Sequence, residues 1–240
     1  MTSDSSKSGL PVNSLTKISV FFLLFTGVLS AFYWIGRVTF IGGFLVEIYA
    51  VLFLFSPLLY IKLSGGSEEH DSSPLLKQVL IGFAVSIIVL GLFAILYRFY
   101  FESACSGKLP LLGRDCRSFH SFAWPENTRT FLNILAFNLI AVALPEEYFY
   151  RGFLQPLILK SSSFTDWALK RKMLAAVLIQ AVFFAAGHFL VDFNPLRLAV
   201  FFPAVIFGFL AFKSGGITAG IIFHALANQV SWILEKGFFG

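Results

Sequence analysis

The sequence is poor in charged residues. Only 13% of its 240 residues are Asp, Glu, Lys or Arg, whereas 57% are hydrophobic and 31 are phenylalanine. A soluble domain of this length would carry roughly twice that charged fraction. The scarcity of charge, together with a mean hydropathy of +0.80, excludes an ordinary soluble globular protein and predicts an integral membrane protein.

Several common signatures are also missing. The first 16 residues are polar and rich in serine, without the apolar segment of a secretory signal. There is no internal repeat, no low-complexity block and no motif typical of nucleic-acid binding. The net charge of +5 is therefore attributed to loops that face anionic lipid. The zinc-protease motif HExxH is absent as well.

Long apolar runs are what the sequence has instead. They predict an all-α, polytopic transmembrane bundle of about seven helices, with six to eight as the range. The expected spans are 17–36, 40–61, 78–97, 129–158, 173–190, 197–212 and 216–234. We expect three regions: a flexible polar tail over 1–16, an N-terminal transmembrane region over 17–128 and a C-terminal transmembrane core over 129–240.

The loop over 98–128 contains the two cysteines of the chain, Cys105 and Cys116. Lys and Arg residues near the span ends favour a cytoplasmic 160–172 loop, which would leave the 98–128 loop on the outer side of the membrane. A disulfide between the two cysteines is expected in that case, because the outer side is oxidising. Two unrelated thiols are the alternative.

The fourth span breaks the rule that charge avoids lipid. The stretch LPEEYFYRGF places Glu146, Glu147 and Arg151 in it, although each unpaired charge at mid-helix costs roughly 2.5–3.5 kcal/mol. Glu147 and Arg151 are four residues apart, so they share a helix face and can form an ion pair. Glu146 points about 100° away. One glutamate is thus expected to be structural, and the other is left for chemistry.

Two later spans carry further polar pairs. FFAAGHFL places Phe184 and His188 four apart, and FHALANQ places His224 and Asn228 four apart, so each pair lies on one helix face. At about 1.5 Å per residue, the polar residues of these pairs and Glu146 all lie roughly 15–22 Å from the same membrane side. Each could singly be an ordinary packing or helix-contact residue. Their shared depth predicts one polar layer.

Such a layer suits hydrolysis of a peptide bond by activated water. Glu146 would take a proton from the water, and His188 would hold the water or deliver a proton to the leaving amine. His224 and Asn228 would donate hydrogen bonds to the developing oxyanion. This chemistry needs neither a covalent enzyme intermediate nor a cofactor. Glu146, His188 and His224 also form a credible set of zinc ligands, which stays open as an alternative.

Three motifs together resemble a known family. EEYFYR matches EExxxR, FAAGH matches FxxxH, and HALAN matches HxxxN. In this order, each within a hydrophobic span, they resemble the CAAX-processing and bacteriocin-processing (CPBP, or Abi) intramembrane endopeptidases, which are related to the Ras-converting CAAX endopeptidase. The resemblance covers about residues 130–234.

The resemblance implies a glutamic-type protease in an all-helical bundle, with residues 129–240 as its catalytic core. The implied roles are base for Glu146 with His188, oxyanion site for His224 with Asn228, and site support for Glu147, Arg151 and Phe184. The partner would be a membrane-anchored or lipid-proximal substrate: a prenylated protein, a bacteriocin-like peptide or a protein with a sorting signal. The absence of an organelle signal favours a prokaryotic cell membrane, with the site opening outward.

Two other classes of function stay open. A non-catalytic immunity or scaffold membrane protein would use the polar layer only to order the bundle. A small transporter would use a proton-coupled carboxylate, at which only Glu47 and Pro203 hint. Glu47 is expected either to pair with Arg151 or line the cavity, or to be hydrated near the membrane interface. Gln180 is expected to orient the His188 ring.

Overall fold

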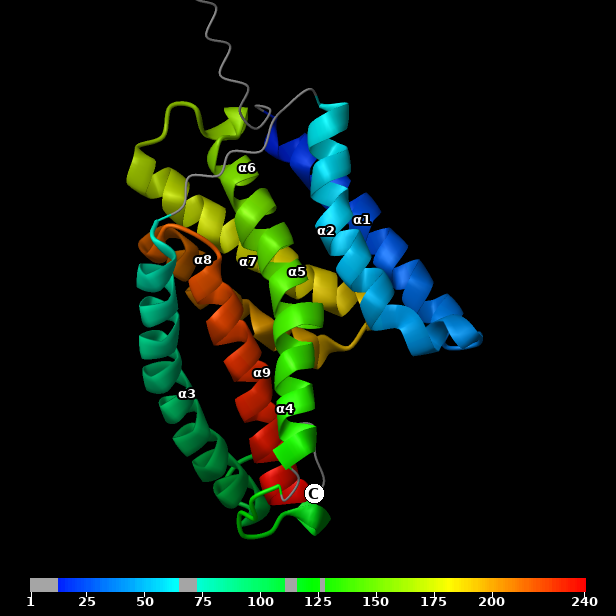
Figure 1. The fold of residues 1–240 in the computed structure, drawn as a ribbon, viewed down its shortest axis with the longest axis vertical. Coiled ribbons are helices and arrows are strands. Elements are labelled where there is room, and N and C mark those ends of the chain that lie inside the picture. The colour runs from blue at the N-terminus through cyan, green and yellow to red at the C-terminus, as the bar shows by residue number, and fades with distance from the viewer. Residues whose placement is uncertain (1–12, 65–72, 111–115, 126–127) are drawn as a thin grey trace, which may run out of the picture. The chain divides into compact units, whose positions relative to one another are not determined.

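Helices make up the regular structure of the described part of the chain. The computed structural model describes residues 13–64, 73–110, 116–125 and 128–240. Its elements there are α-helices, short 3-10 helices and two π-helices (Figure 1). Within these described ranges, six helical segments are long and apolar enough to cross a membrane. The all-α, polytopic fold class predicted from the sequence is therefore confirmed.

The six spans follow the apolar runs of the sequence. They are Leu15–Gly36, Phe40–Leu63, Leu75–Cys105, Arg129–Leu159, Leu169–Asp192 and Pro195–Ser214. The third continues past its predicted end at 97, with Arg98 and Glu102 paired one turn apart on its exposed face at 2.7 Å. The seventh predicted span, 216–234, corresponds to the 22-residue helix α9 (Thr218–Phe239). This helix is not among the six, because its polar side chains lower its hydropathy.

Contacts within the chain define two compact units. Among the described residues, the first consists of 13–64, 73 and 145–217, and the second of 74–110, 116–125, 128–144 and 218–240. Both are discontinuous in sequence. The division into 1–16, 17–128 and 129–240 follows motif content rather than contacts, and it stays a prediction.

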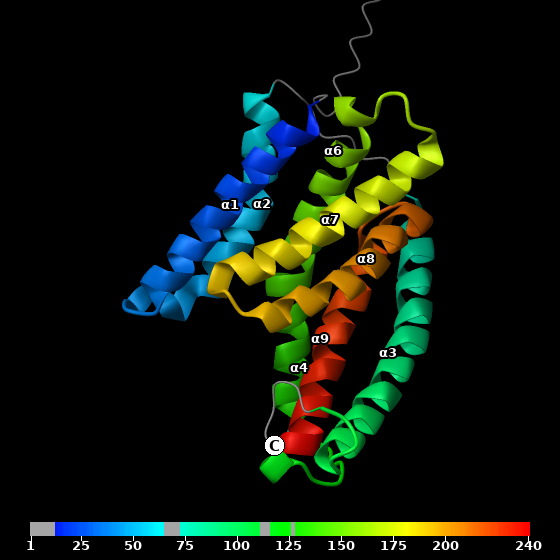
Figure 2. The same ribbon diagram turned by 180° about the vertical axis from the view of Figure 1, so that it is seen from behind.

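Five helices dominate the first unit: α1 (Leu15–Gly36), α2 (Leu45–Leu63), α6 (Gln155–Leu159), α7 (Leu169–Asp192) and α8 (Phe201–Ser214). The long helix α7 contacts α1, α6 and α8 (Figure 2). The core is aromatic: the ring centroid of Phe149 lies 4.4 Å from that of Phe25 and 5.2 Å from that of Phe53. Because lipid is as apolar as these rings, close packing rather than exclusion of water holds such helices together.

The fourth span is not a regular α-helix. In chain order it consists of α4 (Thr128–Phe137), a π-helix (Asn138–Ala143), α5 (Leu144–Glu147), a second π-helix (Tyr148–Leu154) and α6. Pro145 lies in the short α-helical piece between the two π-helices and has no N–H to donate, which disfavours a regular hydrogen-bond ladder there. π-Helical turns concentrate at functional sites. Here they flank Glu146 and Glu147.

The second unit is built on α3 (Leu75–Cys105) and α9, which lie side by side (Figure 1). Gln78 Oε1 accepts a hydrogen bond from the Thr218 N–H at 3.1 Å and so satisfies a donor in the first turn of α9. Gly82 permits a close approach of the helices, since a Cβ there would lie 3.1 Å from the Ala219 backbone. A small residue at the contact is therefore a packing requirement.

The Cys105–Cys116 pair considered from the sequence is joined by a disulfide. The bridge lies next to an aromatic cluster in which the Phe119 ring is 6.3 Å from Phe101 and 5.6 Å from Phe238. Residues 111–115 and 126–127 of the 98–128 loop lie outside the described residues. The membrane side of this loop stays a prediction.

Gly82→Val should force α3 away from α9. The new side chain would meet the Ala219 backbone and the Ile222 Cβ, 3.2 Å away, and neither can swing aside. We expect a loss of about 1–3 kcal/mol of stability, measured as a lower thermal-unfolding midpoint in detergent micelles. Gly91→Val in the same helix is the matched control, because a Cβ at Gly91 meets nothing within 4 Å. Equal midpoints for the two variants would contradict this packing.

Candidate functional site

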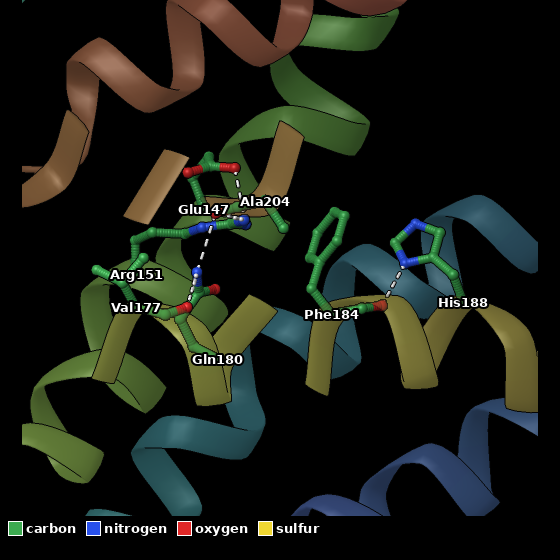
Figure 3. A network of polar contacts seen from close by, with 7 residues as sticks. All are labelled: Glu147, Arg151, Val177, Gln180, Phe184, His188 and Ala204. Atoms are coloured by element: carbon green, nitrogen blue, oxygen red, sulfur yellow. Dashed lines mark hydrogen bonds and ion pairs between the residues drawn. The ribbon is translucent and has the colours of Figure 1, made fainter. Parts of the chain in front are cut away.

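A fully buried ion pair joins Glu147 and Arg151. Arg151 Nη1 donates to Glu147 Oε1 at 3.0 Å, and neither side chain is exposed. Arg151 Nη2 also donates to the Ala204 carbonyl on α8 at 3.4 Å (Figure 3). The pairing predicted from the four-residue spacing is confirmed. It neutralises two charges that would each be costly alone in a membrane interior.

Aromatic rings complete the surroundings of Arg151. Its guanidinium carbon lies 4.6 Å from the Phe184 ring centroid and 4.7 Å from that of Phe207. A cation over an aromatic face at such distances is attracted by the ring, more strongly where water is excluded. The phenylalanine of the FxxxH stretch thus contacts the arginine of the EExxxR stretch.

His188 is held by the backbone of its own helix. Its Nδ1 lies 2.8 Å from the Phe184 carbonyl oxygen (Figure 3). Because a carbonyl oxygen only accepts, Nδ1 carries a proton and donates, and a neutral ring would therefore have its lone pair on Nε2. The Phe184 and His188 rings are also adjacent, with centroids 4.4 Å apart. Phe184 therefore links the ion pair to the imidazole.

Glu146 and His188 line the same cavity, which has a volume of about 260 Å³. The other polar residues that line it are Tyr33, Tyr49, Tyr150 and Arg197. Glu146 is partly buried, whereas Glu147 is fully buried. Consecutive glutamates therefore have different surroundings: Glu147 pairs with Arg151, and Glu146 borders the cavity that His188 also lines. A carboxylate and an imidazole on one cavity suit proton transfer to and from a water bound there.

The prediction for Gln180 is wrong, and so is one of the two alternatives for Glu47. Gln180 does not orient the His188 ring: it lies about 12 Å away along the helix axis, and its Nε2 donates to the carbonyls of Val177 at 3.1 Å and Ala204 at 3.0 Å. Glu47 does not pair with Arg151 or line the cavity. It is exposed in the first turn of α2, where an acidic side chain favours the helix dipole.

Tyr150 and Arg197 are cavity residues that the sequence analysis did not single out. Tyr150 occupies a variable position of EExxxR, so the motif gives no signal for it. Its hydroxyl fits against α7 because residue 187 is glycine: a Cβ at Gly187 would lie 2.7 Å from that oxygen. For Arg197 the sequence does contain a signal: a turn-forming Asn-Pro lies between it and Asp192. Asp192 is its ion-pair partner at 2.6 Å.

His224 and Asn228 lie one turn apart on α9, in the second unit. His224 is buried and Asn228 is partly buried. The neighbouring Gln229 donates through Nε2 to the Phe131 carbonyl on α4 at 3.4 Å, a helix contact that the sequence did not indicate. Since Glu146 and His188 belong to the first unit, a joint site of all four residues stays a prediction.

No cluster of three or more His, Cys, Asp or Glu residues suited to a metal ion occurs within the described ranges. The zinc alternative draws its ligands Glu146, His188 and His224 from both units. It therefore also stays a prediction.

Comparison with known proteins finds a family match over part of the chain. Residues 128–230 match the model of the Rce1-like family, described as Type II CAAX prenyl endopeptidase Rce1-like. Searches of curated proteins and of solved structures found no match. The matched stretch contains all three motifs, and it is similar to the CPBP/CAAX intramembrane proteases that the motifs resemble. More narrowly, the matching model is that of the Rce1-like type II endopeptidases, which bears out the resemblance over residues 128–230. Together with six helices of the described ranges that are long and apolar enough to cross a membrane, it supports an integral membrane protein.

Glu147→Gln should destabilise the fold strongly, because it leaves the Arg151 charge buried without its counterion. The expected loss is about 3–5 kcal/mol, measured as thermal-unfolding midpoint and as yield of monodisperse protein in detergent. Glu102→Gln is the matched control: it breaks an i,i+4 Arg–Glu pair whose side chains are 66% and 48% exposed, for which about 1 kcal/mol or less is expected. Equal losses in the two variants would show that burial is not what matters.

Proposed function

We propose that the chain is an intramembrane endopeptidase of the glutamic type, in which Glu146 and His188 activate the attacking water. The observation that carries the proposal is that these two side chains border one cavity while the adjacent Glu147 is paired with Arg151. The family of residues 128–230, one of CAAX prenyl endopeptidases, supports peptide hydrolysis as the reaction class.

In the proposed mechanism, the Glu146 carboxylate takes one proton from the water, whose oxygen attacks the scissile carbonyl carbon. His188 Nε2 accepts a hydrogen bond from the other O–H and keeps the water in line. The resulting oxyanion accepts hydrogen bonds from His224 and Asn228, each typically worth about 2.7–4 kcal/mol. Collapse of the tetrahedral intermediate breaks the C–N bond, and the proton held by Glu146 passes to the leaving amine, directly or through His188.

The proposed substrate is a membrane-anchored or lipid-proximal protein or peptide. A prenylated CAAX-type chain is the first candidate, because the matching family is described by that specificity. Bacteriocin-like peptides and proteins with sorting signals remain further candidates. On the orientation expected from the Lys and Arg distribution, the enzyme works near the outer face of a prokaryotic cell membrane.

Glu146→Gln should lower the rate of cleavage by at least about 10²–10⁴-fold, since a glutamine cannot accept the proton. The rate is measured in membranes with a prenylated peptide that carries a fluorophore and a quencher on opposite sides of the cleaved bond. Glu47→Gln, at an exposed glutamate outside the cavity, is the matched control and should cleave normally. If Glu146→Gln and His188→Ala both keep full cellular activity, a non-catalytic immunity or scaffold role takes the place of this proposal.

Cleavage should survive strong chelation, because every proposed step uses side chains and water. Membranes treated with a chelator and then washed are assayed with the same peptide, and a known zinc protease in parallel proves that the treatment removes metal. A loss of activity that added zinc restores would favour the alternative with Glu146, His188 and His224 as ligands.

A further inference from the structure

Arg197 brings a guanidinium to the cavity that contains Glu146 and His188. Its Nε donates to Asp192 Oδ2 at 2.6 Å, and its side chain is 47% exposed against 9% for Asp192. A guanidinium has five N–H donors. The structure gives its Nη1 and Nη2 groups no hydrogen bond to any residue in the described ranges, so one edge of the fork is open to a ligand.

The local backbone is built to hold this arginine. α7 ends at Asp192, and Phe193 takes a left-handed conformation with φ of 56°, which a bulky residue rarely adopts. Asp192 Oδ1 accepts the Asn194 N–H at 3.2 Å, and Asn194 in turn caps the 3-10 helix Pro195–Val200 that carries Arg197. Strained backbone of this kind concentrates at functional sites. Here the tight turn brings Arg197 back to Asp192.

The Arg197–Asp192 ion pair lies about one helical turn from His188, the imidazole of the proposed mechanism. Asp192 follows His188 by four residues on the same helix, which is about 6 Å along the axis. An extended peptide advances about 3.3–3.6 Å per residue. A substrate whose scissile carbonyl lies at Glu146 and His188 therefore reaches Arg197 within a few residues.

The ligand that fits an open guanidinium edge is a carboxylate, which it binds through two parallel N–H···O bonds. An anionic group enters a partly apolar cavity that the Glu146 carboxylate already borders only if a cation receives it. Asp192 holds the guanidinium through Nε and leaves the opposite edge for the ligand.

We propose that Arg197 is a specificity-determining residue that binds a carboxylate of the substrate, the C-terminal carboxylate of the peptide that is released. The inference rests on the proposed endopeptidase function and deepens it. It assigns to this cavity a second task beside water activation: selection of substrates whose cleaved bond lies near a free chain end.

The test compares prenylated peptides that are identical except at the C-terminus, which is a free carboxylate, an amide, or an amide that follows an added glutamate. Binding is measured with full-length Glu146→Gln protein in neutral-lipid nanodiscs, so that turnover does not interfere. We expect the free acid to bind on the order of tenfold more tightly than the plain amide. Added Arg197→Gln should bring this ratio close to one, and Arg197→Lys should keep only part of it, because an ammonium lacks the planar fork.

Arg98→Gln is the matched control, since Arg98 forms an Arg–Glu pair of similar length, 2.7 Å, outside this cavity; it should leave the ratio unchanged. Should Arg197→Gln fold poorly, Asp192→Asn retains the arginine, loosens its orientation and should lower the ratio.

An acid-to-amide ratio unchanged by Arg197→Gln and by Asp192→Asn would overturn the inference. The inference would also be overturned if Arg197→Gln weakened the binding of all three peptides equally and only in anionic-lipid nanodiscs. That result would assign Arg197 to lipid phosphate. Tight binding of the amide peptide with the added glutamate would show that Arg197 binds a side-chain carboxylate, and it would overturn the assignment to the C-terminal carboxylate. Failure of the wild type to cleave any peptide would refute the proposed protease, whereas the binding ratio still decides the role of Arg197.

Discussion

A charge placed inside a membrane must meet an opposite charge, and the buried Glu147–Arg151 pair is how this chain meets that constraint. The pair is more than a local neutralisation. Arg151 also reaches the Ala204 carbonyl on α8 and the ring of Phe184 on α7. One guanidinium thereby holds the turn of the fourth span that carries Arg151 against two other helices of the first unit.

The position of Glu146 at the cavity follows from this ion pair. Because Glu147 is committed to Arg151, the neighbouring carboxylate borders the cavity. Phe184 connects the two parts of the site, with its ring on the arginine and its carbonyl accepting the His188 Nδ1 proton. Glu147 and Arg151, which are structural, thus help to position Glu146 and His188, which we propose to be catalytic. Such supporting contacts are what keep a reactive geometry within narrow limits.

What the sequence could predict depends on how local each feature is. The all-α class and the Glu147–Arg151 and Phe184–His188 pairings arise from helical periodicity or hydrophobicity over one segment, and the structure has them. The π-helical turns beside Pro145 depend on backbone strain and packing, which spacing does not encode. Gln180 was misassigned because its partner is a carbonyl on another helix. The joint action of His224 and Asn228 with Glu146 depends on contacts between segments far apart in sequence, and it stays a prediction.

The most direct test of the central claim is to identify new peptide termini by mass spectrometry in membranes whose reaction takes place in ¹⁸O-labelled water. The account predicts a substrate terminus with ¹⁸O in its carboxylate in membranes that contain the wild-type chain. The same terminus should be missing with Glu146→Gln at equal protein level. Labelled termini that are identical in the two samples would contradict Glu146 as the base.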